Sequence, residues 1–230
     1  MAYHPDDTLL TLYASGEIDT ARGVAIASHL ESCSRCRDRV GELEQLEADS
    51  LQQMKLEVTE SNDISEQEMQ RVFDNMLDDI MSLDMDFSAP RSRQEAKITV
   101  NGKEILVPAP LKPIVERMGE WRSYGGKVFT SNIDLGEEYR VSLLYITEGV
   151  QVPQHTHKGL ESTLVLHGAF SDESGCYNKG DYLEENEETK HAPKTMEGQD
   201  CLCLSILTQP LVFTQGVARI FNRFGKGMYP

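Results

Sequence analysis

The sequence predicts a two-part α plus β protein, with a small helical N-terminal region followed by an all-β C-terminal region. Apolar residues recur at helical spacing through most of residues 5–82. From residue 97 on, they fall instead in short runs separated by turn residues. The stretch between the two patterns, which contains Ser88-Ala-Pro-Arg-Ser-Arg, has no period and suits a linker. We therefore expect a helical domain at 1–85, a linker at 86–96 and a β domain at 97–230.

Four helices are expected in the N-terminal region. The first covers about residues 5–16 and ends at Gly16, while Asp19 can cap the second. The third carries apolar residues at helical spacing, namely Val40, Leu43, Leu46, Leu51 and Met54. Ser65 and Glu68 have the capping-box spacing that begins a fourth helix.

A His-x3-Cys-x2-Cys cluster lies at the end of the second helical pattern and consists of His29, Cys33 and Cys36. His29 and Cys33 share a helix face, and a short break after them can turn Cys36 back toward the pair. Zinc prefers four tetrahedral ligands and binds imidazole and thiolate well, so a fourth ligand is needed. His4 is the candidate, since no other histidine precedes position 155. We predict a Zn²⁺ site here that supplies much of the stability of a small bundle.

Two other interpretations of the cysteine pair remain open. A thioredoxin-like redox pair would need a βαβ context, whereas the surrounding pattern is helical. The pair could also be two small buried thiols beside a surface histidine. Zinc-bound thiolates remain oxidisable, and their oxidation would expel the metal. A structural and a redox-active zinc site are therefore both compatible with the sequence.

The fourth helix carries a long apolar stripe that could face a core or a partner. Its members fall at helical spacing over about four turns: Met69, Val72, Phe73, Met76, Leu77, Ile80 and Met81. Packing against the first three helices is one interpretation. The other is a partner-binding helix, because methionine is flexible and recurs at surfaces that must adapt to other proteins.

The formal charge of −16 is concentrated in the helical region. Residues 1–90 contain 6 basic and 20 acidic side chains, whereas residues 91–230 contain 16 and 18. Such a region should repel nucleic acid and membrane surfaces and attract a basic protein, although a merely well-solvated surface gives the same pattern. We expect no direct binding to nucleic acid or membrane.

Targeting signals are not evident in the sequence. The chain begins without a basic and apolar leader, and its apolar runs are too short to span a bilayer. Five cysteines, two of them in the expected metal site, do not suggest a disulfide framework. We therefore expect a cytoplasmic protein.

Short strands make up the C-terminal region. The segment Lys97–Val107 consists of two runs joined by Asn101-Gly102, which predicts a tight hairpin. Further runs lie at Lys127–Thr130, Tyr139–Ile146, Ser162–Leu166, Cys201–Leu207 and Leu211–Phe213. Many short strands without long helices between them indicate a sandwich or a barrel.

A second set of metal-ligating residues lies among these strands, in Gly149-x5-His155-x-His157-x3-Glu161-x6-Gly168. His155 and His157 share one face of a strand, Glu161 follows after a turn, and His191 can complete the set. Three imidazoles and a carboxylate suit Zn, Mn, Fe or Ni, so we predict a second divalent metal without choosing among them. The alternative is a barrel whose remaining ligands no longer bind.

The spacing of these residues resembles the first motif of the cupin superfamily at each fixed position. Of the second cupin motif, Gly180 and His191 are kept, but the usual Pro-x-Gly and trailing Asn are absent. The resemblance implies a double-stranded β-helix. His167 has the strand parity of Glu161 and can lie behind the metal ligands or be an ordinary hydrogen-bonded residue. Three further cysteines are assigned no role: Cys201 and Cys203, which line the barrel or its core, and Cys176.

A helical His-x3-Cys-x2-Cys region followed by a cupin resembles the ChrR family of anti-sigma factors over almost the whole chain. His4, His29, Cys33 and Cys36 match the ligands of its zinc-binding anti-sigma domain, and the four cupin ligands match as well. The resemblance implies that residues 1 to about 85 sequester an extracytoplasmic-function (group IV) sigma factor without enzymatic chemistry. It also implies that the cupin serves the response to singlet oxygen, related oxidants or organic hydroperoxides.

Other function classes remain compatible with the same residues. A cupin metalloenzyme, such as a dioxygenase or isomerase, could be regulated by the helical domain, since cupins have many activities. The sequence shows no further general base beside the motif, and no catalytic triad or phosphate loop. A zinc-dependent assembly module for another basic protein is the third possibility.

Overall fold

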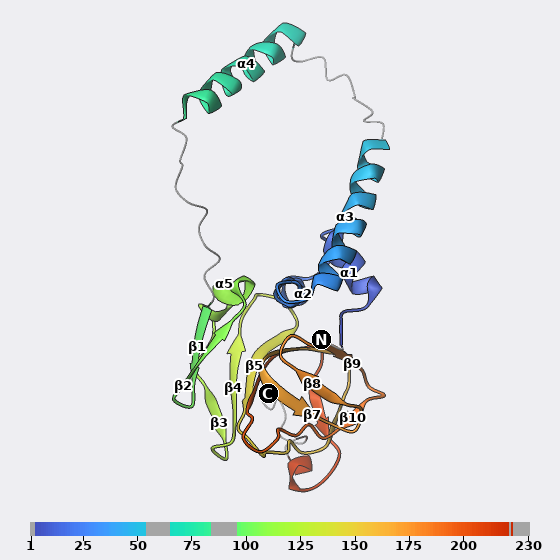
Figure 1. The fold of residues 1–230 in the computed structure, drawn as a ribbon, viewed down its shortest axis with the longest axis vertical. Helices are drawn as coiled ribbons and strands as arrows, with labels where there is room; N and C mark the ends of the chain where they lie inside the picture. Colours follow the sequence, from blue (N-terminus) through green and yellow to red (C-terminus); the bar gives the residue numbers. More distant parts are fainter. Residues whose placement is uncertain (1–2, 54–64, 84–95, 221, 223–230) are drawn as a thin grey trace. The chain divides into compact units, whose positions relative to one another are not determined.

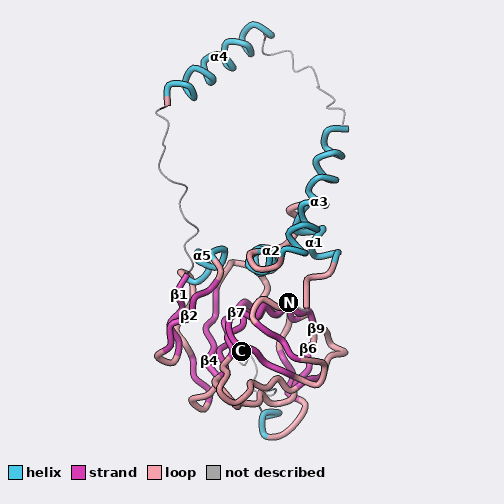
Figure 2. The backbone as a smooth tube through the Cα atoms, in the orientation of Figure 1, coloured by secondary structure: helices cyan, strands magenta, loops and turns pink. Residues whose placement is uncertain are grey.

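The computed structural model of the chain describes residues 3–53, 65–83, 96–220 and 222. It contains a helical N-terminal region and a C-terminal domain of β-strands, which confirms the predicted α plus β class (Figures 1 and 2). The chain divides into two compact units, one made of Met1–Glu47 together with Glu95–Pro230 and the other of Ala48–Gln94. The division at 85 and 97 stays a prediction. Of the expected linker 86–96, only Ala96 lies within the described residues.

The four predicted helices are present: α1 (Asp7–Ala14), α2 (Thr20–Leu30), α3 (Ser34–Gln53) and α4 (Glu66–Ser82). Asp19 caps α2 as predicted, because its side chain accepts a hydrogen bond from the backbone of Arg22. The predicted capping box also forms at the start of α4, where the side chains of Ser65 and Glu68 each accept from the other's backbone N–H. No helix in the described part of the chain is both long and apolar enough to cross a membrane.

The helices α1 and α2 and the first half of α3 share one hydrophobic core with the β domain. Buried side chains of this core include Leu10, Ile26 and Val40 from the helices and Leu111, Leu164 and Leu204 from the β domain. Helix α2 contacts β7, β11 and the short helix η1 (Ala109–Leu111). Its buried residues are mostly small, including Ala21, Ala25 and Ser28, which lets the helix approach the strands closely. Figure 2 shows α1, α2 and α5 (Lys112–Val115) gathered on one side of the strands.

The β domain begins with a two-stranded hairpin of β1 (Ala96–Val100) and β2 (Lys103–Val107). Val100 pairs with Lys103, so Asn101 and Gly102 form the predicted two-residue turn. Both turn residues have positive φ, of 48° and 73°, as a primed turn requires.

Two further sheets form the body of the domain. The seven-stranded sheet contains β3 (Arg122–Tyr124), β4 (Val128–Ile133), β5 (Arg140–Ile146), β11 (Cys201–Leu207), β7 (Glu161–Ser171) and β8 (Cys176–Asn178) in this order, with β9 (Tyr182–Glu185) paired to β7. The three-stranded sheet runs β10 (Lys190–His191), β6 (His155–His157), β12 (Leu211–Phe213). A short helix, η2 (Val217–Ile220), follows β12.

All paired strands in these sheets are antiparallel. The strand runs expected from the sequence are confirmed. The strands β3, β8, β9 and β10 were not predicted, because two to four residues are too few to show an alternating pattern.

Two candidate metal centres

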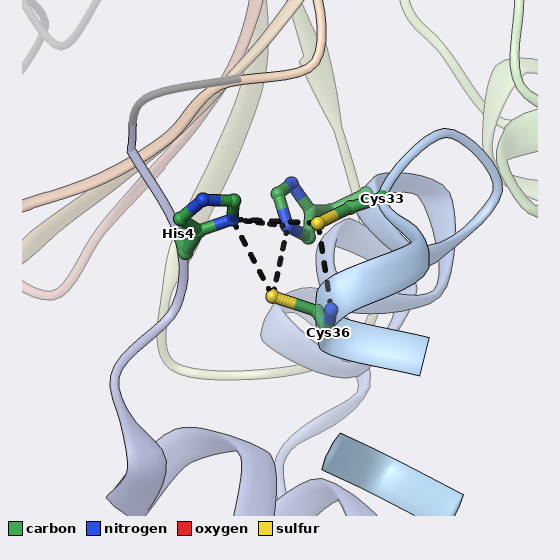
Figure 3. A group of neighbouring side chains, drawn as sticks. His4, Cys33 and Cys36 are labelled. Carbon is green, nitrogen blue, oxygen red and sulfur yellow. Dashed lines mark hydrogen bonds between the residues drawn. The ribbon is translucent and has the colours of Figure 1, made fainter. Parts of the chain in front are cut away.

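The residues of the predicted zinc site come from four segments of the chain and lie together. His4 precedes α1, His29 lies in the last turn of α2, and Cys36 lies in the first turn of α3. The sequence predicts a helix that carries both His29 and Cys33, with a break after them, but α2 already ends at Leu30. Cys33 therefore lies within the segment between Leu30 and Ser34 rather than on the helix. Figure 3 shows the side chains of His4, Cys33 and Cys36 converging on one point.

The spacing of the ligand atoms is that of a tetrahedral zinc site. The Nδ1 atom of His4 lies 3.5 Å from Nε2 of His29 and 3.4 Å from Sγ of Cys33. Cys36 Sγ lies 3.4 Å from Nε2 of His29. Zinc bonds of about 2.0 Å to nitrogen and 2.3 Å to sulfur give tetrahedral edges of roughly 3.3 to 3.8 Å. One ligand atom from each of the four residues lies within 4.8 Å of the others, so the donor set fits a zinc ion.

Burial shapes the electrostatics of this cluster. His29, Cys33 and Cys36 are all buried. Burial, together with the hydrogen bond from Cys33, raises the pKa of Cys36 to about 12. Burial also lowers the pKa of His29. The histidine therefore stays neutral, and the thiolate that zinc binds is strongly disfavoured unless a cation compensates its charge.

The predicted cupin ligands also lie together. His155 and His157 project from β6, Glu161 begins β7, and His191 on β10 is paired with His155. Nε2 of His191 lies 3.0 Å from Nε2 of His155 and 3.3 Å from Nε2 of His157. One ligand atom from each of the four residues lies within 4.8 Å of the others, and all four residues are buried.

Three imidazole nitrogens that face one another need a proton or a cation between them. Burial lowers the pKa of His155 and of His157 to about 4, so both present neutral rings near pH 7. Burial also acts to lower the pKa of His191, but its hydrogen bonds to Glu185 and Asp172 outweigh this and raise the pKa to about 9. His157 Nδ1 is buried 3.1 Å from Oε2 of Glu161, but no group among the described residues hydrogen-bonds to it. The donor set therefore fits a divalent metal.

Two acidic residues beside this cluster were missed in the sequence. Oδ2 of Asp172 and Oε1 of Glu185 each lie 3.0 Å from Nδ1 of His191. Neither residue is a fixed position of the recognised motifs, and only the fold brings them to the histidine. Asp172 follows the end of β7 and Glu185 ends the four-residue strand β9, so neither position gave a periodic signal from which this placement could be inferred.

The remaining candidate residues lie outside the cluster. His167 Nε2 lies 3.2 Å from Oδ1 of Asp200, as expected of an ordinary hydrogen-bonded histidine. Cys201 and Cys203 are buried with their sulfur atoms 3.5 Å apart, and Cys176 is exposed.

A cavity of about 490 Å³ adjoins the cupin cluster and is lined from both sheets. Its polar lining includes His155, Glu161, Glu185 and His191. Its apolar lining includes Val128, Leu144, Ile146, Phe170, Leu211 and Phe213. The arrangement can hold a mostly apolar small molecule next to the metal ligands.

Within the unit Ala48–Gln94, the apolar stripe of α4 is exposed. Its side chains are between 48% and 60% accessible for the predicted partner-binding residues Met69, Val72, Phe73, Met76, Leu77 and Ile80. A contiguous exposed apolar stripe is typical of a surface that binds another protein. The partner-binding role of the stripe stays a prediction.

Comparisons with known proteins cover both halves of the chain. The ChrR Cupin-like domain family matches residues 120–210, and a zinc-finger family matches residues 7–37. Anti-sigma-E factor ChrR of Cereibacter sphaeroides is 34% identical over 225 residues, which are 96% of this chain and 97% of that protein. A chain in the crystal structure of Rhodobacter sphaeroides SigE in complex with the anti-sigma ChrR is 31% identical, with a TM-score of 0.66. The match covers 89% of this chain and 98% of that one.

Proposed function

This chain belongs to the ChrR family of anti-sigma factors, and we propose that it sequesters an extracytoplasmic-function sigma factor in the cytoplasm. The relative in the solved structure is in complex with SigE, which supports a sigma factor as the partner class here. Inhibition is steric. The bound sigma factor cannot reach RNA polymerase or promoter DNA while this chain covers its surfaces.

The observation that carries the proposal is the exposed apolar stripe of α4. Phe73 and Met76 lie near its centre and are 59% and 53% accessible. Asp74, Asp78 and Asp79 lie elsewhere on the same helix, and the whole region up to residue 90 is strongly acidic. Such a helix offers an apolar contact surface to a partner, and the acidic charge attracts the basic surfaces of a DNA-binding protein.

Zinc at the His4, His29, Cys33 and Cys36 cluster would hold the segments of this region in fixed positions relative to one another. The four side chains come from the N-terminal segment, α2, the break after α2 and the start of α3. When bound, zinc supplies a cation that stabilises both thiolates and crosslinks these segments.

The test uses the full chain and an extracytoplasmic-function sigma factor from the same genome. Phe73→Asp combined with Met76→Asp should weaken the complex at least tenfold and restore sigma-dependent transcription, since two exposed apolar contacts become charged. Asn75→Asp on the same helix is the matched control and should still repress. Wild-type-like binding and repression by the double variant would refute the role of α4.

The cupin is the sensor in this proposal. We propose that singlet oxygen or another oxidant changes the cupin metal or a neighbouring side chain, which alters the contacts between the β domain and the helices and releases the sigma factor. Two separate variants, His157→Ala and Glu161→Ala, should each keep repression and lose the oxidant response. If both repression and response survive in these variants, the sensing role is wrong.

The cavity beside the cupin ligands favours a second function of another class. A cavity of about 490 Å³ next to a metal-ligand set can also serve a metalloenzyme, such as a dioxygenase or isomerase. Turnover of a small substrate by the purified chain, abolished by His157→Ala, would support that activity.

A further inference from the structure

Two carboxylates lie beside Nδ1 of His191, which can donate a hydrogen bond to only one of them. Its Nδ1 atom carries at most one hydrogen, yet Asp172 and Glu185 each place an oxygen 3.0 Å from it. Its Nε2 atom faces the other two histidines of the cluster. One carboxylate is enough to hold the ring in the orientation that a metal ligand needs.

Asp172 is the carboxylate that other hydrogen bonds hold in place. Its Oδ1 atom accepts hydrogen bonds from the backbone of Ser174 at 2.8 Å, the backbone of Gly175 at 3.1 Å and the hydroxyl of Tyr177 at 3.0 Å. Its side chain is fully buried. With one oxygen anchored three times, Asp172 presents the other oxygen to His191 in a fixed position.

Glu185 is held differently. Within the described residues, its carboxylate oxygens contact only histidines of the cluster, with Oε1 at His191 and Oε2 3.7 Å from Nε2 of His157. The β7–β9 register pairs Glu185 with Glu161, so their side chains lie on the same face of the sheet. Both carboxylates line the cavity.

We propose that Glu185 is an additional protein ligand of the metal held by the cupin residues His155, His157, Glu161 and His191. Manganese, iron and nickel accept five or six ligands, so three imidazoles and Glu161 leave positions open. In the structure Glu185 groups with Asp172 and His191 rather than with the full set of cupin ligands. Because Asp172 alone can keep the hydrogen bond of His191, Glu185 is free to turn its carboxylate to the ion. Glu185 borders the cavity, so a small molecule that enters there meets its carboxylate beside the metal ligands. The inference rests on the proposed cupin metal and is independent of the sigma partner.

Manganese is the probe, since hard Mn²⁺ suits imidazole and carboxylate ligands and avoids the thiolate site. Binding to the full-length protein is followed by the electron paramagnetic resonance signal of free Mn²⁺. The number of water molecules on bound Mn²⁺ is followed by the relaxation rate of water protons. Three variants are compared with the wild type: Glu185→Gln, Asp172→Asn and Glu184→Gln. Glu184, on the same strand, is the matched control because its carboxylate contacts Ser162 at 3.2 Å rather than the histidines.

Glu185→Gln should weaken Mn²⁺ binding by about 10- to 100-fold and should raise water relaxation, because water replaces the lost carboxylate. Asp172→Asn should weaken Mn²⁺ binding without raising water relaxation, because Asp172 orients the ligand His191 and does not itself bind the ion. Glu184→Gln should match the wild type.

Wild-type affinity and relaxation in Glu185→Gln would overturn the inference, as would weaker binding without an added water. Failure of the wild-type protein to bind Mn²⁺ would also overturn the inference, while leaving a four-coordinate zinc site in the cupin open. The anti-sigma proposal would stand in each case, because the α4 variants test it separately.

Discussion

His29 Nδ1 lies 2.7 Å from the carbonyl oxygen of Gly180, so a zinc-ligand candidate on α2 is held by the β domain. A carbonyl can only accept, so Nδ1 carries the hydrogen and Nε2 is left with its lone pair toward the cysteines. The turn that presents this carbonyl is anchored by Asp181, whose carboxylate accepts from the backbone of Asn178 and of Tyr3. A ligand of the N-terminal metal centre is therefore oriented by a hydrogen bond to the β domain, far away in the sequence.

Disturbing this turn should weaken zinc binding. Gly180 has a φ of +95°, which strains any other residue, so Gly180→Ala should shift the carbonyl and lower zinc affinity about tenfold. Competition with a chromogenic chelator measures this. Gly198→Ala is the control, since Gly198 also has positive φ, at +77°, but lies in another turn with open space around it. Equal zinc retention in both variants would show that the hydrogen bond does not matter.

Removing a thiol should cost both zinc and stability. Cys33→Ser and Cys36→Ser should each lose one zinc ion per chain and lower the temperature of unfolding, because the ion crosslinks segments that have a thin core of their own. Elemental analysis and calorimetry check this. Cys176→Ser, at an exposed position, should change neither quantity. A serine variant that keeps its zinc would contradict the four-ligand site.

The β domain also caps helix α2. The backbone N–H groups of Thr20 and Ala21 donate to the carboxylate of Glu137, at 2.7 and 3.3 Å. A carboxylate here satisfies free donors and interacts favourably with the helix dipole, so Glu137→Ala should lower the free energy of unfolding by about 1 kcal/mol. Urea denaturation measures the change. Glu138→Ala, at the exposed neighbouring position, should be within error of the wild type.

Metal binding at the cupin cluster should strengthen as the pH rises. The pKa of His191 is about 9 without metal, because its hydrogen bonds to Glu185 and Asp172 outweigh the effect of burial. Below that pH the ring is protonated, and a metal at Nε2 must displace a proton. The apparent affinity for Mn²⁺ should therefore rise up to about tenfold per pH unit between pH 7 and 9, then level off. A flat profile over this range would show that His191 does not bind the metal.

The sequence by itself determined the local features of this protein. The Asn101-Gly102 turn and the Ser65 capping box depend on residues a few positions apart, and both form as expected. The ligand candidates were also identifiable, because metal chemistry restricts residue types and spacing within a motif. Only His4 and His191 had to be inferred across longer distances, and the structure brings each to its cluster.

The tertiary structure alone decided which other groups surround those ligands. Asp172, Glu185 and the Gly180 carbonyl reach their histidines through strand register and through the packing of α2 on the strands. It also decided that the α4 stripe is exposed within its own unit, Ala48–Gln94, since helical periodicity gives the direction of an apolar face but not what covers it. The physical reason is the same in each case. These contacts join residues that are distant in the chain, and the local sequence around a residue does not specify which distant segment packs against it.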